Sequence, residues 1–132
     1  MRGWIFLPAL ALLLAETAQA GAAIPPCRAN PDRVGSCRTV HGRFFFANGT
    51  PSKRIWVVGT RRILGVSERP AAGGEGVEGL PANLQAALPD QPFRTEVYGD
   101  FEVCPFTRER PGWMQIVCIA RAARLHVVRR EG

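Results

Sequence analysis

The sequence predicts a small all-β domain with five to six strands and one short helix, either a disulfide-stabilised barrel of the oligonucleotide/oligosaccharide-binding (OB-like) type or a sandwich. Three observations predict it. Short β-branched and aromatic segments alternate with turns from residue 37 onward, four cysteines can cross-link the chain, and 132 residues suffice for one core only. The helix expected after the third strand favours the barrel.

The first twenty residues have the pattern of a secretory signal peptide. Arg2 precedes an apolar run over residues 4–15, and Ala18-Gln19-Ala20 offers a cleavage site after Ala20. The apolar run is too short to cross a bilayer, so we expect no membrane anchor after cleavage. We expect a periplasmic or secreted protein with a Pro-rich N-terminal segment at 21–36 and a single β domain at 37–132.

Export to an oxidising compartment favours disulfides over a metal site for the four cysteines, Cys27, Cys37, Cys104 and Cys118. Neither close spacing matches structural zinc, and we expect no metal and no cofactor. Three pairings are possible. We expect the local ones, Cys27–Cys37 and Cys104–Cys118, because a hairpin turning about Pro111 places residue 104 opposite residue 118.

The first half of the β domain predicts a three-stranded meander. Val40, Phe44 and Phe46 alternate with polar residues and lead into Asn48-Gly49, a strong hairpin signal. Strands at 54–58 and 62–66 follow, separated by a turn at Gly59-Thr60. A Gly-rich loop at 67–79 then leads to a short helix at 80–88.

The second half predicts a hairpin and a last short strand. In residues 94–103 the odd positions are suited to a core and the even positions are mainly acidic. The partner strand covers 113–119, so Val103 faces Ile119 in the core while residues 104 and 118 lie on the outer face. A separate strand is expected at 125–128.

The net charge of +6 comes almost entirely from arginine, since Lys53 is the sole lysine. The near-exclusive use of arginine indicates a GC-rich coding genome first and a site for an anionic polymer second. Arginine beside aromatic residues suits contacts with proteins or anionic polymers. The candidate binding residues are Trp56, Arg61, Arg62, Tyr98, Arg108, Arg110 and Trp113. The alternative is that the arginines pair with the acidic strand and that Trp113 covers one end of the core.

No catalytic residue is assigned, because neither His41 nor His126 lies in a catalytic motif and every cysteine has a role in a disulfide. Asp100 and Glu102 share one strand face, and with a histidine they could serve a small hydrolytic or metal-dependent enzyme. Such acidic pairs are also common on solvated strand faces.

Three segments resemble small exported bacterial proteins that have no assigned activity. They are VYGDFEVCPFTRERPGWMQIVCI at 97–119, RIWVVGTRRILGV at 54–66 and VHGR at 40–43. The resemblance covers residues 37–128 and implies an envelope or secreted protein, with no catalytic residue to carry over.

We therefore expect an exported, non-catalytic binding or structural module of the bacterial cell envelope. It would contact another envelope or secreted protein, or an anionic polymer. Nucleic acid is disfavoured as a partner because export removes the protein from genomic nucleic acid. The alternatives are the small enzyme using Asp100, Glu102 and a histidine, and an inhibitor of a secreted enzyme.

Overall fold

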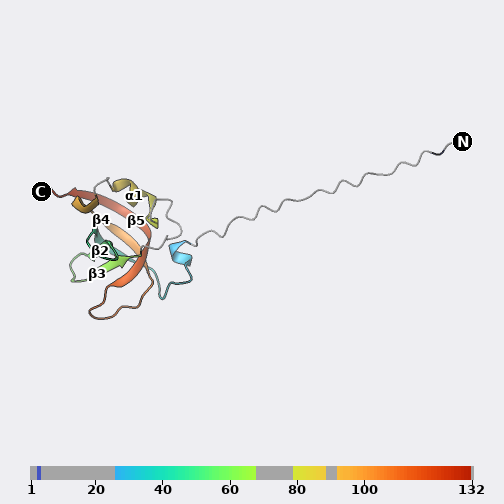
Figure 1. The fold of residues 1–132 in the computed structure, drawn as a ribbon, viewed down its shortest axis with the longest axis horizontal. Coiled ribbons are helices and arrows are strands. Elements are labelled where there is room, and N and C mark those ends of the chain that lie inside the picture. The colour runs from blue at the N-terminus through green and yellow to red at the C-terminus, as the bar shows by residue number, and fades with distance from the viewer. Residues whose placement is uncertain (1–2, 4–25, 68–78, 89–91, 132) are drawn as a thin grey trace.

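The computed structural model describes residues 3, 26–67, 79–88 and 92–131 (Figure 1). The predicted signal peptide, apart from Gly3, and residues 68–78 of the Gly-rich loop lie outside this part of the chain. The described elements are η1 (Cys27–Ala29), β1 (Arg38–Phe46), β2 (Lys53–Val57), β3 (Ile63–Val66), α1 (Ala82–Ala87), η3 (Pro92–Arg94), β4 (Thr95–Pro105) and β5 (Gln115–Arg129).

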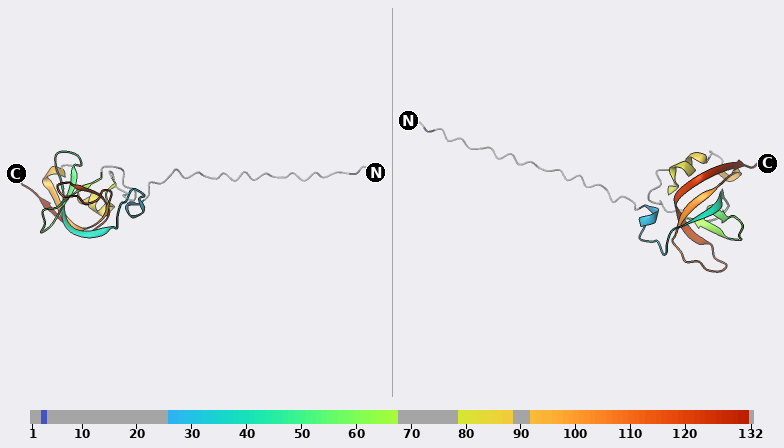
Figure 2. Two further views of the ribbon diagram at one scale, coloured as in Figure 1. Left: turned by 90° about the horizontal axis from the view of Figure 1, so that it is seen from below. Right: turned by 180° about the vertical axis from the view of Figure 1, so that it is seen from behind.

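The five strands form a closed barrel in the order β1-β2-β3-β5-β4, with β1 pairing back onto β4. The view from below shows the strands curving around this ring (Figure 2, left). The pairs are antiparallel except for β3 with β5, which run parallel. The barrel is therefore the correct alternative, and α1 lies between β3 and β4 in the chain, as the sequence predicts for the OB-like type.

Alternation along the strands produces the core. Phe44 and Ile55 of the meander and Val97, Phe101 and Val103 of β4 are fully buried, and each such side chain contributes about 1.5–3 kcal/mol. The helical segment adds Leu80 and Leu84, which are also buried. The predicted inward and outward faces of β1 and β4 are confirmed by this pattern.

The two strands expected at 113–119 and 125–128 are one continuous strand, β5. The alternation of apolar and polar residues breaks between them, and the backbone absorbs the break without leaving the sheet. Arg124 adopts a positive φ of 52°, and the β4–β5 register shifts between Tyr98 and Asp100. Beyond this bulge the pairing with β4 resumes, with Val127 opposite Val97, and the ladder continues to Arg129.

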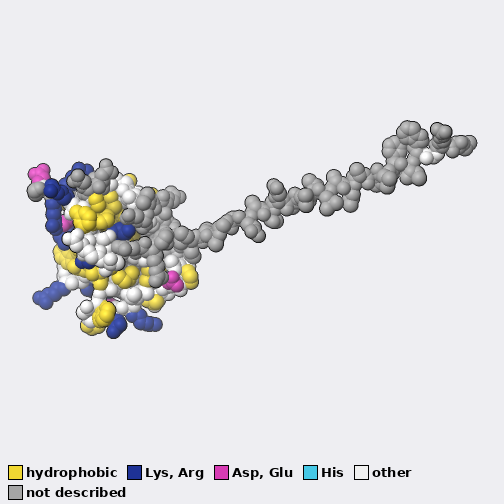
Figure 3. Space-filling model, viewed as in Figure 1, with side chains coloured by type: hydrophobic (Ala, Val, Ile, Leu, Met, Phe, Trp, Pro, Cys, Tyr) yellow, Lys and Arg dark blue, Asp and Glu magenta, His cyan; other side chains and the backbone are white. Residues whose placement is uncertain are grey.

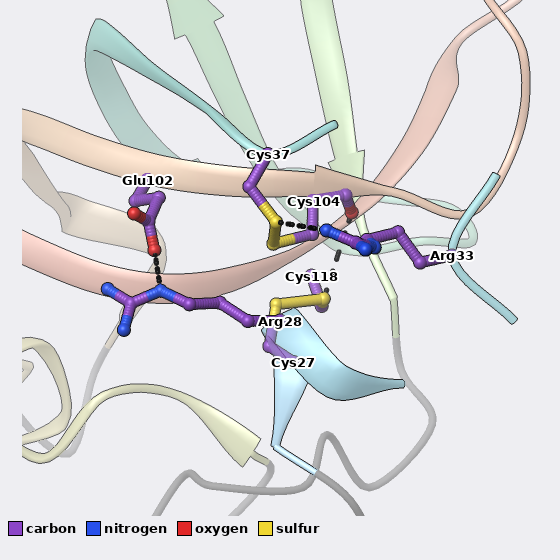
Figure 4. A network of polar contacts seen from close by, with 7 residues as sticks. All are labelled: Cys27, Arg28, Arg33, Cys37, Glu102, Cys104 and Cys118. Atoms are coloured by element: carbon purple, nitrogen blue, oxygen red, sulfur yellow. Dashed lines mark hydrogen bonds and ion pairs between the residues drawn. A yellow bond between two sulfur atoms is a disulfide. The ribbon is translucent and has the colours of Figure 1, made fainter. Parts of the chain in front are cut away.

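The expected disulfide pairing is wrong, although the register on which it rested is right. Cys104 does face Cys118 across the β4–β5 ladder, and Val103 faces Ile119. The bonds, however, join Cys27 to Cys118 and Cys37 to Cys104 (Figure 4).

The second neighbour of Cys104 explains the difference. In the β1–β4 ladder Arg38 pairs with Val103, so the next position places Cys37 opposite Cys104 on that side. Cys104 bonds to the β1 side, and Cys118 then bonds to Cys27 of η1, which lies against β5. The β4–β5 hairpin alone does not predict the contact between Cys37 and Cys104, since β1 and β4 are far apart in the sequence.

The two disulfides fasten the segment 27–37 across the outer face of β4 and β5. The Arg28 side chain pairs with Glu102 alongside them (Figure 4), and the amide of Val34 donates to the carbonyl of Pro105 at 2.8 Å. The bonded cysteines are 91 and 67 residues apart. The disulfides point to an oxidising compartment outside the cytoplasm. Within the described residues, no helix has the length and apolar character needed to span a membrane.

Candidate functional site: a basic groove between two loops

The acidic face of β4 neutralises several of the arginines. Glu96 pairs with Arg43 and Arg130, while Glu102 pairs with Arg28. Asp100 accepts from the Arg124 guanidinium on one oxygen, and its other oxygen lies 2.9 Å from Nδ1 of His41. Arg28, Arg43, Arg124 and Arg130 therefore serve as partners of this acidic strand.

Three basic side chains without a carboxylate partner lie on the loops at one end of the barrel. Within the described residues Arg61, Arg108 and Arg110 form no ion pair. Two of them line a groove of about 380 Å³ between the β2–β3 loop (58–62) and the β4–β5 loop (106–114). We call it the loop groove, and its lining includes Arg61, Arg62, Ile63, Glu109, Arg110, Trp113 and Met114.

The β2–β3 loop is a tight turn held by its own residues. Gly59 has a φ of 81°, which favours glycine, and the amide of Thr60 donates to the carbonyl of Val57 at 3.1 Å. The indole N–H of Trp56 donates to the carbonyl of Thr60 at 2.7 Å. The backbone that carries Arg61 is therefore fixed at its base.

The β4–β5 loop ends in a second turn, over residues 110–113. Pro111 followed by Gly112 at a φ of 78° is typical of a type II turn, and the amide of Trp113 donates to the carbonyl of Arg110 at 3.1 Å. The turn brings its first and last side chains together, with the Arg110 guanidinium 5.0 Å from the ring centroid of Trp113. Trp113 remains 69% exposed.

The buried side chain of Gln115 connects both loops to the barrel through hydrogen bonds. Its Oε1 accepts from Arg62 at 2.8 Å and from Arg38 at 3.0 Å, and its Nε2 donates to the carbonyl of Thr107 at 3.0 Å. Arg62 also pairs with Glu109 at 3.1 Å. This network positions the two walls of the loop groove before any ligand binds. Toward the lower end of the molecule, where the β4–β5 loop projects in Figure 1, hydrophobic and basic side chains lie next to each other (Figure 3).

The loop groove brings together four of the residues singled out from the sequence, namely Arg61, Arg62, Arg110 and Trp113. The other three lie outside its lining. Arg108 is exposed on the same loop. Trp56 lies beside Ile63 on the outer face, where its ring packs against Arg43. Tyr98 is on β4, on the far side of β1 from β2.

Sequence reasoning missed Ile63, Met114 and Gln115 as parts of the site. A signal for Ile63 exists, because Leu64 and Val66 point into the core and alternation turns residue 63 outward. Gln115 carries no comparable signal. Its partner Arg38 is 77 residues away in the sequence, so the role of Gln115 depends on tertiary structure.

Asp100 and Glu102, the acids of the enzyme alternative, are both held by basic partners. Hydrogen bonds from His41 and Arg124 hold the pKa of the Asp100 carboxyl below its usual value, which favours an ionised ion-pair partner over a general acid. Glu102 is held by Arg28. A small cleft of about 190 Å³ lies between these acids and Arg121. Among the described residues, the one group that could supply three metal ligands is Cys27, Cys104 and Cys118, which are in disulfides.

Comparison with known proteins adds no functional assignment. The sequence matches no family model, and no curated protein or solved structure matches it. The function must therefore be argued from the side chains of this chain alone.

Proposed function

We propose that the protein is an exported, non-catalytic binding module of the bacterial cell envelope that binds an anionic partner through the loop groove. One observation carries the proposal: Arg61 and Arg110, which have no carboxylate partner in the described chain, line the same groove as the exposed Trp113. Tryptophan and arginine are the side chains most often responsible for binding energy at protein interfaces.

Export is supported from two directions. Residues 1–20 have the pattern of a signal peptide with cleavage after Ala20, and the two disulfides suit an oxidising compartment. The mature protein would then meet periplasmic or secreted proteins and anionic envelope polymers.

The rigidity of the loop groove favours binding over catalysis. The Gln115 network and the two glycine turns hold its walls, so little conformational entropy is lost when a partner docks. No hydroxyl or thiol nucleophile paired with a base is among the residues that line it.

Affinity capture from an envelope extract tests the proposal, with a charge-reversed groove variant beside the wild-type protein. Arg61→Glu combined with Arg110→Glu should lose the retained partner. Arg121→Glu combined with Arg129→Glu is the matched control, because both side chains are exposed and lack an ion pair in the described chain. Retention should also fall as salt rises. Equal retention by wild type, groove variant and control would disprove the proposal.

A further inference from the structure

The lining of the loop groove includes apolar as well as basic side chains. Together they restrict the chemistry of its ligand more than charge alone does. Ile63, Met114 and Trp113 line it together, from β3 and from the β4–β5 loop. Ile63 is 38% exposed and Trp113 69%, so both are available to a partner. Inorganic polyphosphate would satisfy the arginines but would leave this apolar surface in water. The ligand therefore carries an apolar group as well as negative charge.

The small number of aromatic rings in the loop groove argues against a nucleic acid strand as the ligand. Proteins that bind single strands stack successive bases on several exposed rings. Trp113 supplies the one aromatic ring among the described residues that line the groove. Trp56 and Phe45 do not line the groove, and their rings lie 5.0 and 5.2 Å from the Arg43 guanidinium.

The size of the groove sets the scale of the group it receives. A volume of about 380 Å³ is at the low end for a small-ligand site, and it suits one or two amino-acid side chains. The arginines stand on both walls, Arg61 on the β2–β3 loop and Arg110 on the β4–β5 loop. Negative groups on both sides of one apolar anchor would match this distribution of charge.

We infer that the loop groove binds an acidic segment of a partner protein, with one apolar side chain seated on Ile63, Met114 and Trp113. Carboxylates before and after that anchor pair with Arg61 and Arg110. Arg62 contributes less, because Glu109 and Gln115 already occupy its guanidinium. This inference rests on the proposed function and names the chemistry of its partner.

Fluorescence anisotropy with short labelled peptides tests it on the oxidised protein. The probe is a central leucine flanked on both sides by aspartates, and its control has serine in place of leucine. Burying the leucine should make the first peptide bind about tenfold more tightly. Inorganic polyphosphate and a single-stranded oligonucleotide serve as competitors, and at equal charge both should compete poorly.

Two variants separate the apolar and the ionic contributions. Trp113→Ala should abolish the preference for leucine over serine, whereas Arg61→Gln should weaken both peptides alike. Phe93→Ala and Arg129→Gln are the matched controls, since each alters an exposed side chain outside the groove lining. Both controls should bind as the wild-type protein does.

The outcomes distinguish this inference from the proposed function. Equal affinity for the two peptides, or stronger binding of polyphosphate or the oligonucleotide, overturns the acidic-segment inference and leaves a general polyanion site. If no probe binds while envelope capture still depends on Arg61 and Arg110, the inference is wrong and the binding module stands. If capture is independent of the groove as well, both are wrong.

Discussion

At the scale of single residues, Asp100 shows how the acidic strand depends on its basic partners. Hydrogen bonds from His41 and Arg124 favour the ionised carboxylate, so its pKa lies below the usual value in the folded state. A carboxyl with a lowered folded pKa contributes stability above its unfolded pKa, near ~3.9. That contribution is lost as the pH falls through the unfolded value toward the folded one.

The Asp100→Asn variant tests this linkage. Its neutral amide keeps the shape but cannot ionise, so it should be less stable than the wild type at neutral pH, and the gap should narrow between about pH 5 and pH 3. Urea midpoints across this range measure the gap. Glu131→Gln is the control at an exposed carboxylate that forms no ion pair in the described chain. A gap that stays constant down to pH 3 would show that Asp100 acts by packing alone.

The residues of the loop groove differ in how far the local sequence predicts their contacts. Arg110-Pro111-Gly112-Trp113 is a turn signal in consecutive letters, so the meeting of its first and last side chains is a local property. Gln115 is different. Its position in the sequence predicts a strand residue, whereas its hydrogen bonds with Arg38 and Arg62 exist only once β1, β5 and the β2–β3 loop are brought together.

At the scale of elements, β5 is the clearest case of tertiary structure overriding sequence pattern. The broken alternation near residue 124 predicts a strand end, yet pairing with β4 carries the strand on to Arg129. A positive φ is unusual for an arginine and costs about 1–2 kcal/mol relative to the right-handed region. Glycine or asparagine at this position would have been a sequence signal for the bulge.

Comparison of Arg124→Gly with Arg124→Ala should reveal this backbone cost. Both variants lose the ion pair with Asp100, so their difference reports the conformation of residue 124. The glycine variant should be more stable by about 1 kcal/mol, measured as the free energy of unfolding in urea.

The same pair of substitutions at Arg121 is the control for this comparison. Arg121 lies in the same strand and has no positive φ, so glycine there should be less stable than alanine. If glycine is the less stable residue at both positions, the strain assigned to Arg124 does not exist.

At the scale of the whole molecule, local signals predict the meander, the helix and the β4–β5 hairpin, and together these favour the barrel. The sequence says nothing direct about β1 pairing with β4, the contact that closes the ring. The wrong disulfide prediction has the same origin. Cys104 has a cysteine neighbour in each of its two ladders, and only closure of the barrel brings Cys37 beside it.

The observed disulfides should stabilise the molecule more than the expected local ones. In the chain-entropy account, closing loops as long as these contributes about 4–5 kcal/mol for a single bond, against about 3 kcal/mol for a loop of some fifteen residues. The two observed loops overlap, so their contributions do not add in full. The segment 27–37 also shields the outer face of the β4–β5 hairpin, where Cys104 and Cys118 are buried.

Paired alanine substitutions separate the two bonds. Cys27→Ala with Cys118→Ala should release η1 but leave the β1–β4 ladder closed, so the barrel should fold with a loss of about 2–5 kcal/mol and an intact loop groove. Cys37→Ala with Cys104→Ala should cost a similar amount and also loosen the start of β1. Urea unfolding measures both. Mass spectrometry of non-reduced peptides gives the linkage in the wild type, and finding Cys104 bonded to Cys118 would refute the arrangement, because that bond leaves the N-terminal segment unattached to the hairpin.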